Sequence, residues 1–320
     1  MTSVPDISVV IPTHNRADRL PSLVKSLTSQ TLGPDRFEVL VVDDCSPDET
    51  WDTLESLATE GVLQIRTMRT AGSSGGPATP RNLGWRASVA PIVAFLDDDC
   101  LPEPDWLRSG LEEMLAHPTW GVMQGCTIPP PGTDMANLSV WSVWRSITAP
   151  NPWFEGANIF YRRRALEETD GFNEDFATWG EDTELGWAVV DSGWERGFAR
   201  GAVAIHEVEQ RGWRHAARFA WRDRNVIQIA AAHPQFRHEA FWRPWAVHRR
   251  NVEVAVAIVG VTASFRWRPA ALLALPYLWL RRPPIRKPGF FRTCAQIGAV
   301  DAARFAGNVR GSIANRIIVL

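Results

Sequence analysis

Apolar runs alternate with amphipathic stretches over the first hundred residues. Residues 7–11, 37–42, 63–68 and 91–96 have the composition and length of strands, and the first, second and fourth are nearly continuous apolar runs. Between them, residues 17–30, 48–57 and 81–87 have helical spacing, with Leu20, Leu23, Val24 and Leu27 on one face of the first. This order predicts an α/β fold of Rossmann-like type, with a mostly parallel central sheet and helices on both faces.

The middle of the chain has a weaker pattern. We expect a strand over residues 157–161, a helix over 182–192 and a strand over 202–206, after a proline-rich loop at 129–131. No internal repeat is visible. The region therefore extends the α/β domain without defining its own fold class.

Two apolar runs, residues 252–265 and 269–280, mark the C-terminal part. They are flanked by basic residues, namely Arg266, Arg268, Arg281, Arg282, Arg286 and Lys287. Each run is too short to cross a bilayer upright. Two interpretations stand side by side: helices lying in a membrane interface with the basic residues on anionic lipid, or a helical subdomain or homodimer interface.

Composition narrows the class of protein. The net charge of -2 gives no bulk electrostatic reason for nucleic-acid binding, so no nucleic-acid partner is expected. The four cysteines form no CxxC pair, which argues against a zinc site or a disulfide framework and favours a reducing, cytoplasmic location. The N-terminal residues lack the basic and apolar segments of a signal peptide.

Carboxylates follow two of the expected strands. Asp43 and Asp44 end the second strand, and Asp97, Asp98 and Asp99 end the fourth. Ligands of open parallel sheets bind at the carboxyl ends of strands, so both acidic clusters are expected over one crevice. Adjacent carboxylates repel each other unless a cation or hydrogen-bond donors lie between them. A solvated acidic turn is the alternative for an isolated triplet, whereas Mg²⁺ or Mn²⁺ is the hard cation that carboxylates hold.

Three motifs surround the acidic triplet in a defined order. They are Val-Val-Ile-Pro-Thr-His-Asn-Arg at 9–16, Val-Val-Asp-Asp-Cys-Ser-Pro-Asp-Glu-Thr at 41–50 and Pro-Arg-Asn-Leu-Gly at 80–84. With the triplet, they resemble family 2 glycosyltransferases of the GT-A fold and the bacterial, non-processive type, over about residues 5–210. The resemblance implies transfer of a sugar from a nucleotide-diphosphate sugar to an acceptor hydroxyl, in glycan or glycolipid synthesis.

The same resemblance implies roles on the donor side. The nucleotide-sugar-binding residues would be Pro12, Thr13, Asn15, Arg16, Asp44, Arg81, Asp97 and Asp98. Asp43 is open as a partner of Asp44 in contacting the base. The metal ligands would be Asp99, with Asp97 beside it, and His206 at the end of the strand over 202–206, for Mn²⁺ or Mg²⁺. Loop or capping structure is the alternative for Asn15, Arg16 and Asn82.

On the acceptor side, residues 154–163 and 171–176 also match the family, and Trp-Gly-Glu-Asp at 179–182 looks like its ED motif. This implies that Asp182 is the base of an inverting displacement and that Glu181 is the weaker candidate, which orients it. The alternative is that both carboxylates complement a helix N-terminus. Trp179 and Trp153 are candidates to stack on the acceptor, which would be a glycan, a lipid-linked glycan or a small molecule.

The predicted domains are residues 1–235, the GT-A catalytic domain, and residues 236–320, a helical C-terminal region. The nucleotide-sugar half would be 1–118 and the acceptor half 119–235. Gln-Arg-Gly-Trp-Arg at 210–214 only approaches the QxxRW element of processive synthases, which favours single transfer. Membrane contact, in that interpretation, runs through residues 252–287 at the inner face of the plasma membrane.

Two other functions remain open. A sugar-nucleotide nucleotidyltransferase usually begins with a Gly-rich phosphate loop, which residues 12–16 do not form. A catalytically inactive GT-A-fold carbohydrate-binding protein would be expected to lose its base or metal ligands. Asp99, Asp182 and His206 are all retained.

Overall fold

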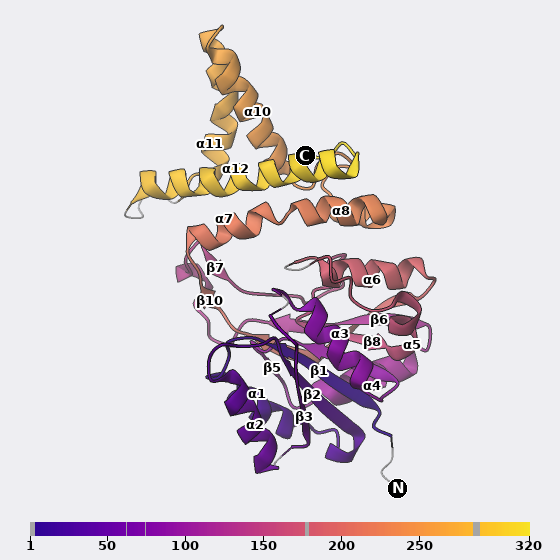
Figure 1. The fold of residues 1–320 in the computed structure, drawn as a ribbon. Coiled ribbons are helices and arrows are strands. Elements are labelled where there is room, and N and C mark those ends of the chain that lie inside the picture. Colours follow the sequence, from indigo (N-terminus) through magenta and orange to yellow (C-terminus); the bar gives the residue numbers. More distant parts are fainter. Residues whose placement is uncertain (1–3, 62, 74, 177–178, 284–288) are drawn as a thin grey trace. The chain divides into compact units, whose positions relative to one another are not determined.

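The computed structural model describes residues 4–61, 63–73, 75–176, 179–283 and 289–320 (Figure 1). Ser74, within the Gly-, Ser- and Pro-rich segment 72–80 that precedes the helix expected over 81–87, and residues 284–287 of the predicted membrane-contact region lie outside this range. The chain forms two compact units. Unit 1 comprises residues 1–137 and 143–209, and unit 2 comprises residues 138–142 and 210–320. The main boundary between the two units follows Glu209. The predicted boundary of the catalytic domain, at residue 235, stays a prediction.

Unit 1 is built on a sheet whose described strands lie in the order β3-β2-β1-β4-β8-β6-β9-β5. The strands are β1 (Ile7–Thr13), β2 (Phe37–Asp43), β3 (Ile65–Arg69), β4 (Ile92–Leu96), β5 (Cys100–Pro102), β6 (Trp120–Ile128), β8 (Asn158–Arg162) and β9 (Glu195–His206). The pairs β3–β2, β2–β1, β1–β4 and β6–β9 are parallel, whereas β8 runs antiparallel to β4 and β6, and β5 to β9. The expected mostly parallel sheet is confirmed.

Helices cover both faces of this sheet (Figure 1). They are α1 (Leu20–Thr28), α2 (Thr50–Glu60), α3 (Ala78–Ala87), α4 (Trp106–Ala116), α5 (Arg163–Thr169) and α6 (Glu181–Asp191), with short 3₁₀ turns η1 (Pro34–Arg36) and η2 (Met135–Asn137). Every residue of β1 and β4 is buried, which explains why these strands are apolar without alternation.

Successive residues of β1 serve opposite layers. Val9 belongs to the core that α1, α2 and α4 close. Val10 points the other way, toward α3, where a Cβ on Gly84 would lie 2.4 Å from its Cγ1. Glycine at this position therefore lets α3 approach the sheet, and α3 in turn carries Arg81 to the strand ends.

The sequence pattern located most of these elements but missed several. The helix expected from residue 17 begins at Leu20, and the strand expected over 202–206 is the end of the longer β9. Neither β6 nor α4 was predicted. β9 contains charged residues and glycines, and it is held by pairing with β6, so its first half has no apolar run to reveal it.

Unit 2 is helical in its described part. Its helices are α7 (Trp213–Trp221), α8 (Arg224–Ala232), α9 (Pro234–Ala240), α10 (Arg249–Ser264), η3 (Arg268–Ala274), α11 (Leu275–Arg281) and α12 (Phe290–Asn315). A separate two-stranded sheet pairs β7 (Ser142–Val143) with β10 (Glu209–Gln210). α12 packs on α7 and α8, where Gly307 and Gly311 allow close approach to the backbone of Trp221 and Arg224.

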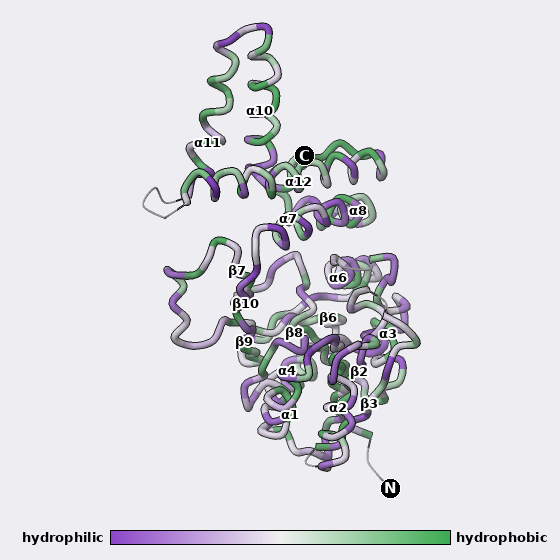
Figure 2. Tube along the Cα trace, turned by 60° about the vertical axis from the view of Figure 1, so that its left-hand side comes forward, coloured by the Kyte–Doolittle hydropathy of each residue, from purple (hydrophilic) through white to green (hydrophobic). Residues whose placement is uncertain are grey.

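α10, η3 and α11 form a helical hairpin that is largely apolar along its length (Figure 2). At its base, Arg281 Nε lies 2.9 Å from Asp301 Oδ2 of α12, and the Tyr277 hydroxyl lies 3.2 Å from the same oxygen. Among the residues that the structure describes, no helix combines the length and hydrophobicity needed to cross a membrane.

Candidate functional site

A cavity of about 410 Å³ opens where β1, β2 and β4 end. Its walls include Pro12, Thr13, His14, Arg16, Asp44, Pro77, Pro80, Arg81, Asp97, Asp98 and Asp99. β1 lies between β2 and β4 and runs parallel to both, so the polar residues after all three strands reach the same edge. Asp44 and the acidic triplet therefore share one crevice, as the sequence predicts.

Asp43 and Asp44 face different surroundings. Asp43 is fully buried, 3.0 Å from Arg69 Nε, and accepts hydrogen bonds from Ser46. The Asp44 carboxylate lines the cavity and accepts a hydrogen bond from the Thr70 hydroxyl at 3.0 Å. The expectation that both carboxylates face the crevice is thus wrong for Asp43. Its carboxylate instead pairs with Arg69 and so links β2 to β3.

The loop after β1 contributes unevenly to the cavity. Asn15 adopts φ 57°, a left-handed conformation that asparagine tolerates, and its amide donates to Ser46 Oγ. The Asn15 side chain is exposed. His14, which the sequence analysis left unassigned, lines the cavity, with Nδ1 3.0 Å from the Asp44 carbonyl oxygen. Its place inside the motif at 9–16 was the available signal.

Arg16 places a cation among three carboxylates. Its guanidinium lies 3.3 Å from Asp98, 4.0 Å from Asp99 and 3.2 Å from Glu209. Burial raises the pKa of Asp98 to about 7, although Arg16 opposes that rise. Glu209 was not predicted, because it reaches this site only through the course of the chain after β9.

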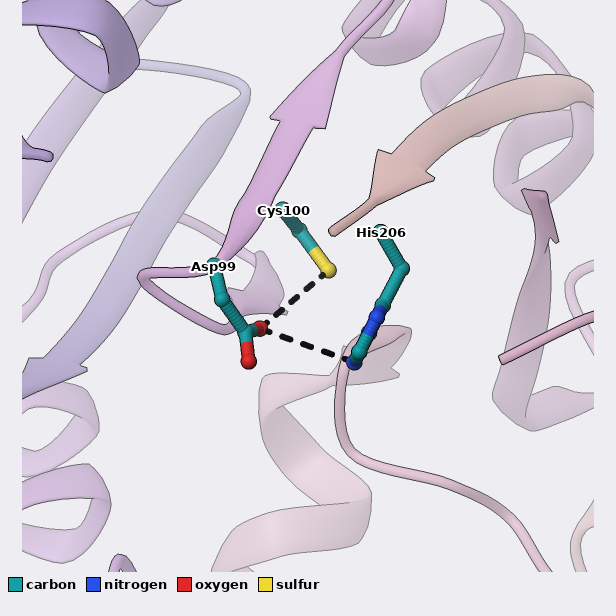
Figure 3. A group of neighbouring side chains, drawn as sticks. All are labelled: Asp99, Cys100 and His206. Atoms are coloured by element: carbon teal, nitrogen blue, oxygen red, sulfur yellow. Dashed lines mark hydrogen bonds and ion pairs between the residues drawn. The ribbon is translucent and has the colours of Figure 1, made fainter. Parts of the chain in front are cut away.

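Asp99 and His206 converge through the pairing of β5 with β9 (Figure 3). His206 Nε2 lies 3.7 Å from Asp99 Oδ1, and Cys100 Sγ lies 3.8 Å from the same oxygen. His206 Nδ1 is 2.6 Å from the Glu207 carbonyl oxygen. Since a carbonyl only accepts, Nδ1 carries the proton, and Nε2 is the nitrogen directed at Asp99.

Cys100 is a neighbour that sequence reasoning missed. The Cys100 sulfur, a carboxylate oxygen of Asp99 and a ring nitrogen of His206 all lie within 4.8 Å of one another. These separations are short enough for the three atoms to bind one metal ion. Burial and the nearby carboxylates raise the pKa of the Cys100 thiol well above its ordinary value. A protonated thiol is a poor ligand for a hard cation, so oxygen and nitrogen donors dominate this cluster. Asp97 lies outside it.

A second cavity, of about 420 Å³, adjoins the same carboxylates. Asp98 and Asp99 line both cavities, and the second is completed by Asp18, Arg19, Ser22, Leu101, Pro130, Ile205 and Glu207. The end of the acidic triplet therefore forms a wall between two hollows, and a group bound to Asp99 would be reachable from either.

Arg81 joins the acidic triplet to the start of α6. It is almost fully buried, with Nη2 2.6 Å from Asp97 and Nη1 2.8 Å from Glu181. Burial lowers the pKa of Arg81, but the attraction of Asp97 and Glu181 outweighs it and raises the pKa. Burial and the charge of Asp182 raise the pKa of Glu181 to about 7. Glu181, only 3% exposed, is thus committed to Arg81.

Asp182 is held by backbone donors. Its carboxylate accepts hydrogen bonds from the Gly156 amide at 2.8 Å and from the Thr183 amide at 2.7 Å. Burial raises the pKa of Asp182, although Arg81 opposes that rise. Unlike Glu181, the residue retains partial exposure. Its carboxylate is therefore oriented by the protein.

Trp153 and Trp179 lie beside each other, with ring centroids 6.3 Å apart and planes inclined by 43°. Both are half-buried, and the Trp153 carbonyl accepts a hydrogen bond from Thr183, next to Asp182.

Two further polar residues lie near the site. Glu155 was not predicted; burial raises the pKa of its carboxyl group, although Arg145, 3.5 Å away, opposes that rise. Asn82, in α3, donates hydrogen bonds to the Phe172 carbonyl and to Glu174, and accepts one from the Trp85 indole.

Comparison with known proteins adds an independent line. The sequence model described as Glycosyl transferase family 2 matches residues 8–172, and the one described as Glycosyl transferase family group 2 matches residues 92–282. The validoxylamine A glucosyltransferase of Streptomyces hygroscopicus subsp. limoneus is 28% identical over 282 residues, covering 78% of this chain and 61% of that protein. The glycosyltransferase AglE of Haloferax volcanii is 28% identical over 212 residues, covering 64% and 68%. The chain thus spans about three fifths of the length of the first of these relatives.

Solved structures resemble the fold over nearly the whole chain. The mannosyltransferase PcManGT of Pyrobaculum calidifontis, in complex with GDP-Man and Mn²⁺, has a TM-score of 0.70 at 24% identity, covering 96% of this chain and 88% of that one. TarS of Staphylococcus aureus, residues 1–349 in complex with UDP, has a TM-score of 0.55 at 18% identity, covering 97% and 91%. The expected GT-A fold with a helical C-terminal part is confirmed.

Proposed function

The chain belongs to glycosyl transferase family 2, and we propose that it transfers a sugar from a nucleotide-diphosphate sugar to an acceptor hydroxyl with inversion at the anomeric carbon. The observation that carries the proposal is the shared cavity, in which Asp44, Arg81 and the acidic triplet line one crevice of about 410 Å³. The GDP-Man and UDP bound by PcManGT and TarS support a nucleotide-linked donor for this chain.

The donor would occupy that cavity. Asp44 would accept a hydrogen bond from the base, and Arg16 would meet the diphosphate once it leaves its carboxylate partners. The remaining donor-side assignments are Pro12, Thr13, Asn15, Arg81, Asp97 and Asp98. For Asn15 the support is the motif alone, since its side chain is exposed.

Mn²⁺ or Mg²⁺ would be held by Asp99 and His206, with Asp97 as a further ligand. The donor set fits such an ion, because the Asp99 oxygen and His206 Nε2 face each other and the Glu207 carbonyl fixes the imidazole tautomer. When bound, the cation neutralises charge on the leaving diphosphate. Asp97 would have to share its carboxylate with Arg81, which holds one of its oxygens at 2.6 Å.

Asp182 would accept the proton of the acceptor hydroxyl on a carboxylate oxygen. The Gly156 and Thr183 amides orient this group, and its burial raises its pKa and thus its basicity. Glu181 would act through Arg81, whose position it fixes, and not on the substrate. The neighbouring Trp153 and Trp179 would offer a face for a sugar ring of a glycan, a lipid-linked glycan or a small-molecule acceptor.

Single transfer, a cytoplasmic location, peripheral membrane contact through residues 252–287 and a homodimer stay predictions. The nucleotidyltransferase alternative is disfavoured because residues 12–16 do not form a Gly-rich phosphate loop. The alternative of an inactive binding protein is disfavoured because Asp182 is retained and accepts a hydrogen bond from the Gly156 amide.

The test is a donor screen that measures release of the nucleoside diphosphate. UDP-, GDP- and dTDP-sugars are incubated with the full chain, candidate acceptors and Mn²⁺ or Mg²⁺. At least one donor should be turned over in a metal-dependent manner, and Asp182→Asn should lower turnover by about 10²–10⁴-fold. Asp191→Asn, an exposed carboxylate at the far end of α6, is the matched control and should be as active as the parent. Turnover by Asp182→Asn at the parental rate would contradict the assignment.

A further inference from the structure

The hairpin formed by α10, η3 and α11 exposes large apolar side chains. Val259, Phe265, Trp267, Leu272, Leu278 and Trp279 are each at least 58% exposed. Exposed apolar residues are ordinary when scattered, but here they occupy one continuous element (Figure 2). Water is a poor surrounding for such a surface, so another apolar phase or partner must cover it.

Among the residues that the structure describes, those that cover the hairpin lie against its inner face. Val254, Ala257 and Gly260 of α10 are buried, and a Cβ on Gly260 would lie 2.7 Å from Leu273 Cβ. The residues on the remaining sides of α10, such as Val256 and Ile258, are exposed and apolar. A helix that lies on a membrane surface keeps one polar face for water. α10 has none beyond its first turns, and this pattern is that of a helix surrounded by apolar material.

The two hydroxyl side chains near the end of α10 are paired within that helix. The Thr262 hydroxyl donates to the Ile258 carbonyl at 2.8 Å, and the Ser264 hydroxyl donates to the Val261 carbonyl at 2.6 Å. Neither hydroxyl needs water as a partner. In hydrocarbon, polar groups must be paired internally, and these two meet that condition.

Charge identifies the kind of apolar phase. The sequence contains no Asp or Glu between Val254 and Val300, whereas Arg266 and Arg268 stand at the turn of the hairpin and Arg281 and Arg282 at its other end. Trp267 and Trp279 lie beside these arginines, as aromatic residues do at membrane interfaces. Two copies of this hairpin would bring like charges together, while phospholipid phosphates would complement them.

We propose that this hairpin is embedded in one leaflet of a bilayer that contains anionic phospholipid. Its apolar sides contact acyl chains. Arg266 and Arg268 at its turn and Arg282 at its other end reach the phosphates of the same leaflet, since arginine side chains extend their charge away from an apolar stem. α10, with 16 residues, is roughly 24 Å long, which exceeds the roughly 15 Å hydrocarbon thickness of one leaflet, so the helix lies close to the bilayer plane. The proposal replaces helices lying on the surface by a hairpin within the leaflet, and it does not depend on sugar transfer.

The experiment is vesicle flotation of the full chain, with phosphatidylcholine alone or with phosphatidylglycerol at a 7:3 ratio. Val259→Glu with Leu278→Glu changes two exposed hairpin positions, so the folded structure should persist, as checked by circular dichroism. Leu115→Glu with Ile318→Glu is the matched control at positions outside the hairpin that are at least as exposed. The parent and the control should float with the anionic vesicles, and the bound fraction of the hairpin variant should fall at least tenfold.

Two further arms distinguish charge from insertion. Arg266→Gln with Arg268→Gln should weaken binding to anionic vesicles, by about fivefold for each arginine removed. Brominated acyl chains should quench tryptophan fluorescence of the parent, and Trp267→Phe with Trp279→Phe should remove most of that quenching.

Three results would overturn the proposal. They are a parent that stays at the bottom of the gradient with every vesicle, a hairpin variant that floats as well as the parent, and a parent that is a dimer in light scattering, does not float, and dissociates in the hairpin variant. The last result would assign the surface to a second copy.

Discussion

Arg81 offers the sharpest test of how the site is held together. Its guanidinium lies 2.6 Å from Asp97 and 2.8 Å from Glu181, and both Arg81 and Glu181 are almost fully buried. Arg81→Met removes the cation and leaves the Glu181 carboxylate in the interior. Breaking a buried pair by removing one partner costs about 3–5 kcal/mol. We expect a loss of that size in the unfolding free energy of unit 1 at pH 8.

The loss should depend on pH in a defined direction. Burial, with the repulsion of Asp182, raises the pKa of Glu181 from its ordinary 4.5 to about 7, so the native state holds a proton that the unfolded chain has released. For a raised carboxyl pKa, stability is greatest at low pH and falls as pH rises toward the native pKa. The charge of Arg81 lowers the pKa of Glu181, so Arg81→Met should raise that pKa. The decrease in stability with rising pH should then continue above pH 7. The deficit of Arg81→Met should be larger at pH 8 than at pH 6, by about 1 kcal/mol if the pKa gains one unit and by at most about 1.4 kcal/mol if it gains more.

The assay is urea unfolding at pH 6 and pH 8, followed by hydrogen exchange in peptides from α3 and α6, which report unit 1 alone. Adding Glu181→Gln to Arg81→Met removes the unpaired charge and should abolish the pH dependence of the deficit. A deficit below about 1 kcal/mol at pH 8, or one that is equal at both pH values, would refute the reasoning. So would failure of the second substitution to remove the pH dependence.

Four other outcomes are expected. Asp182→Asn should lower kcat by about 10²–10⁴-fold while nucleotide affinity, measured calorimetrically, is retained; an unchanged kcat would exclude it as base. Asp99→Asn should weaken Mn²⁺ binding by at least about tenfold, as counted by the electron paramagnetic resonance of free Mn²⁺; equal affinity would remove it from the site. Arg16→Gln should tighten Mn²⁺ binding without nucleotide, because a competing cation is removed; weaker binding in the same assay would contradict that competition. Gly84→Ala should destabilise unit 1 by about 1–3 kcal/mol in urea, since its Cβ would lie 2.4 Å from Val10; neutrality would mean that the contact relaxes.

The buried parallel strands could be predicted because local pattern and tertiary environment agree. β1, β2 and β4 are apolar runs that end at polar residues, and their observed bounds differ from the predicted ones by one or two residues. α4 carried a usable signal, since Trp106, Leu107, Leu111 and Met114 recur at helical spacing. β6 and the first half of β9 carried much less, because pairing between distant segments decides their conformation.

The site residues likewise fall into those that a local motif indicates and those that only the tertiary structure reveals. Asp44, Arg81, Asp99, Asp182 and His206 stand at element ends that a motif can indicate. No motif indicates the partners of these residues, because each contact depends on how segments distant in sequence cross. Examples are the Arg16–Glu209 pair, the Gly156 amide that donates to Asp182 and the Cys100 thiol beside His206. Asp43 shows the limit most clearly. It neighbours Asp44 in sequence, yet Ser46 and Arg69 hold it in the interior.

The central claim is that the cavity at the strand ends binds a nucleotide together with a divalent cation. Calorimetric titration of UDP, GDP and dTDP into the full chain, with and without Mn²⁺, tests it most directly. The account predicts that at least one nucleotide binds, that Mn²⁺ strengthens the binding, and that Asp99→Ala removes this strengthening. Absence of binding by all three nucleotides in the presence of Mn²⁺, or binding that neither Mn²⁺ nor Asp99→Ala alters, would contradict it.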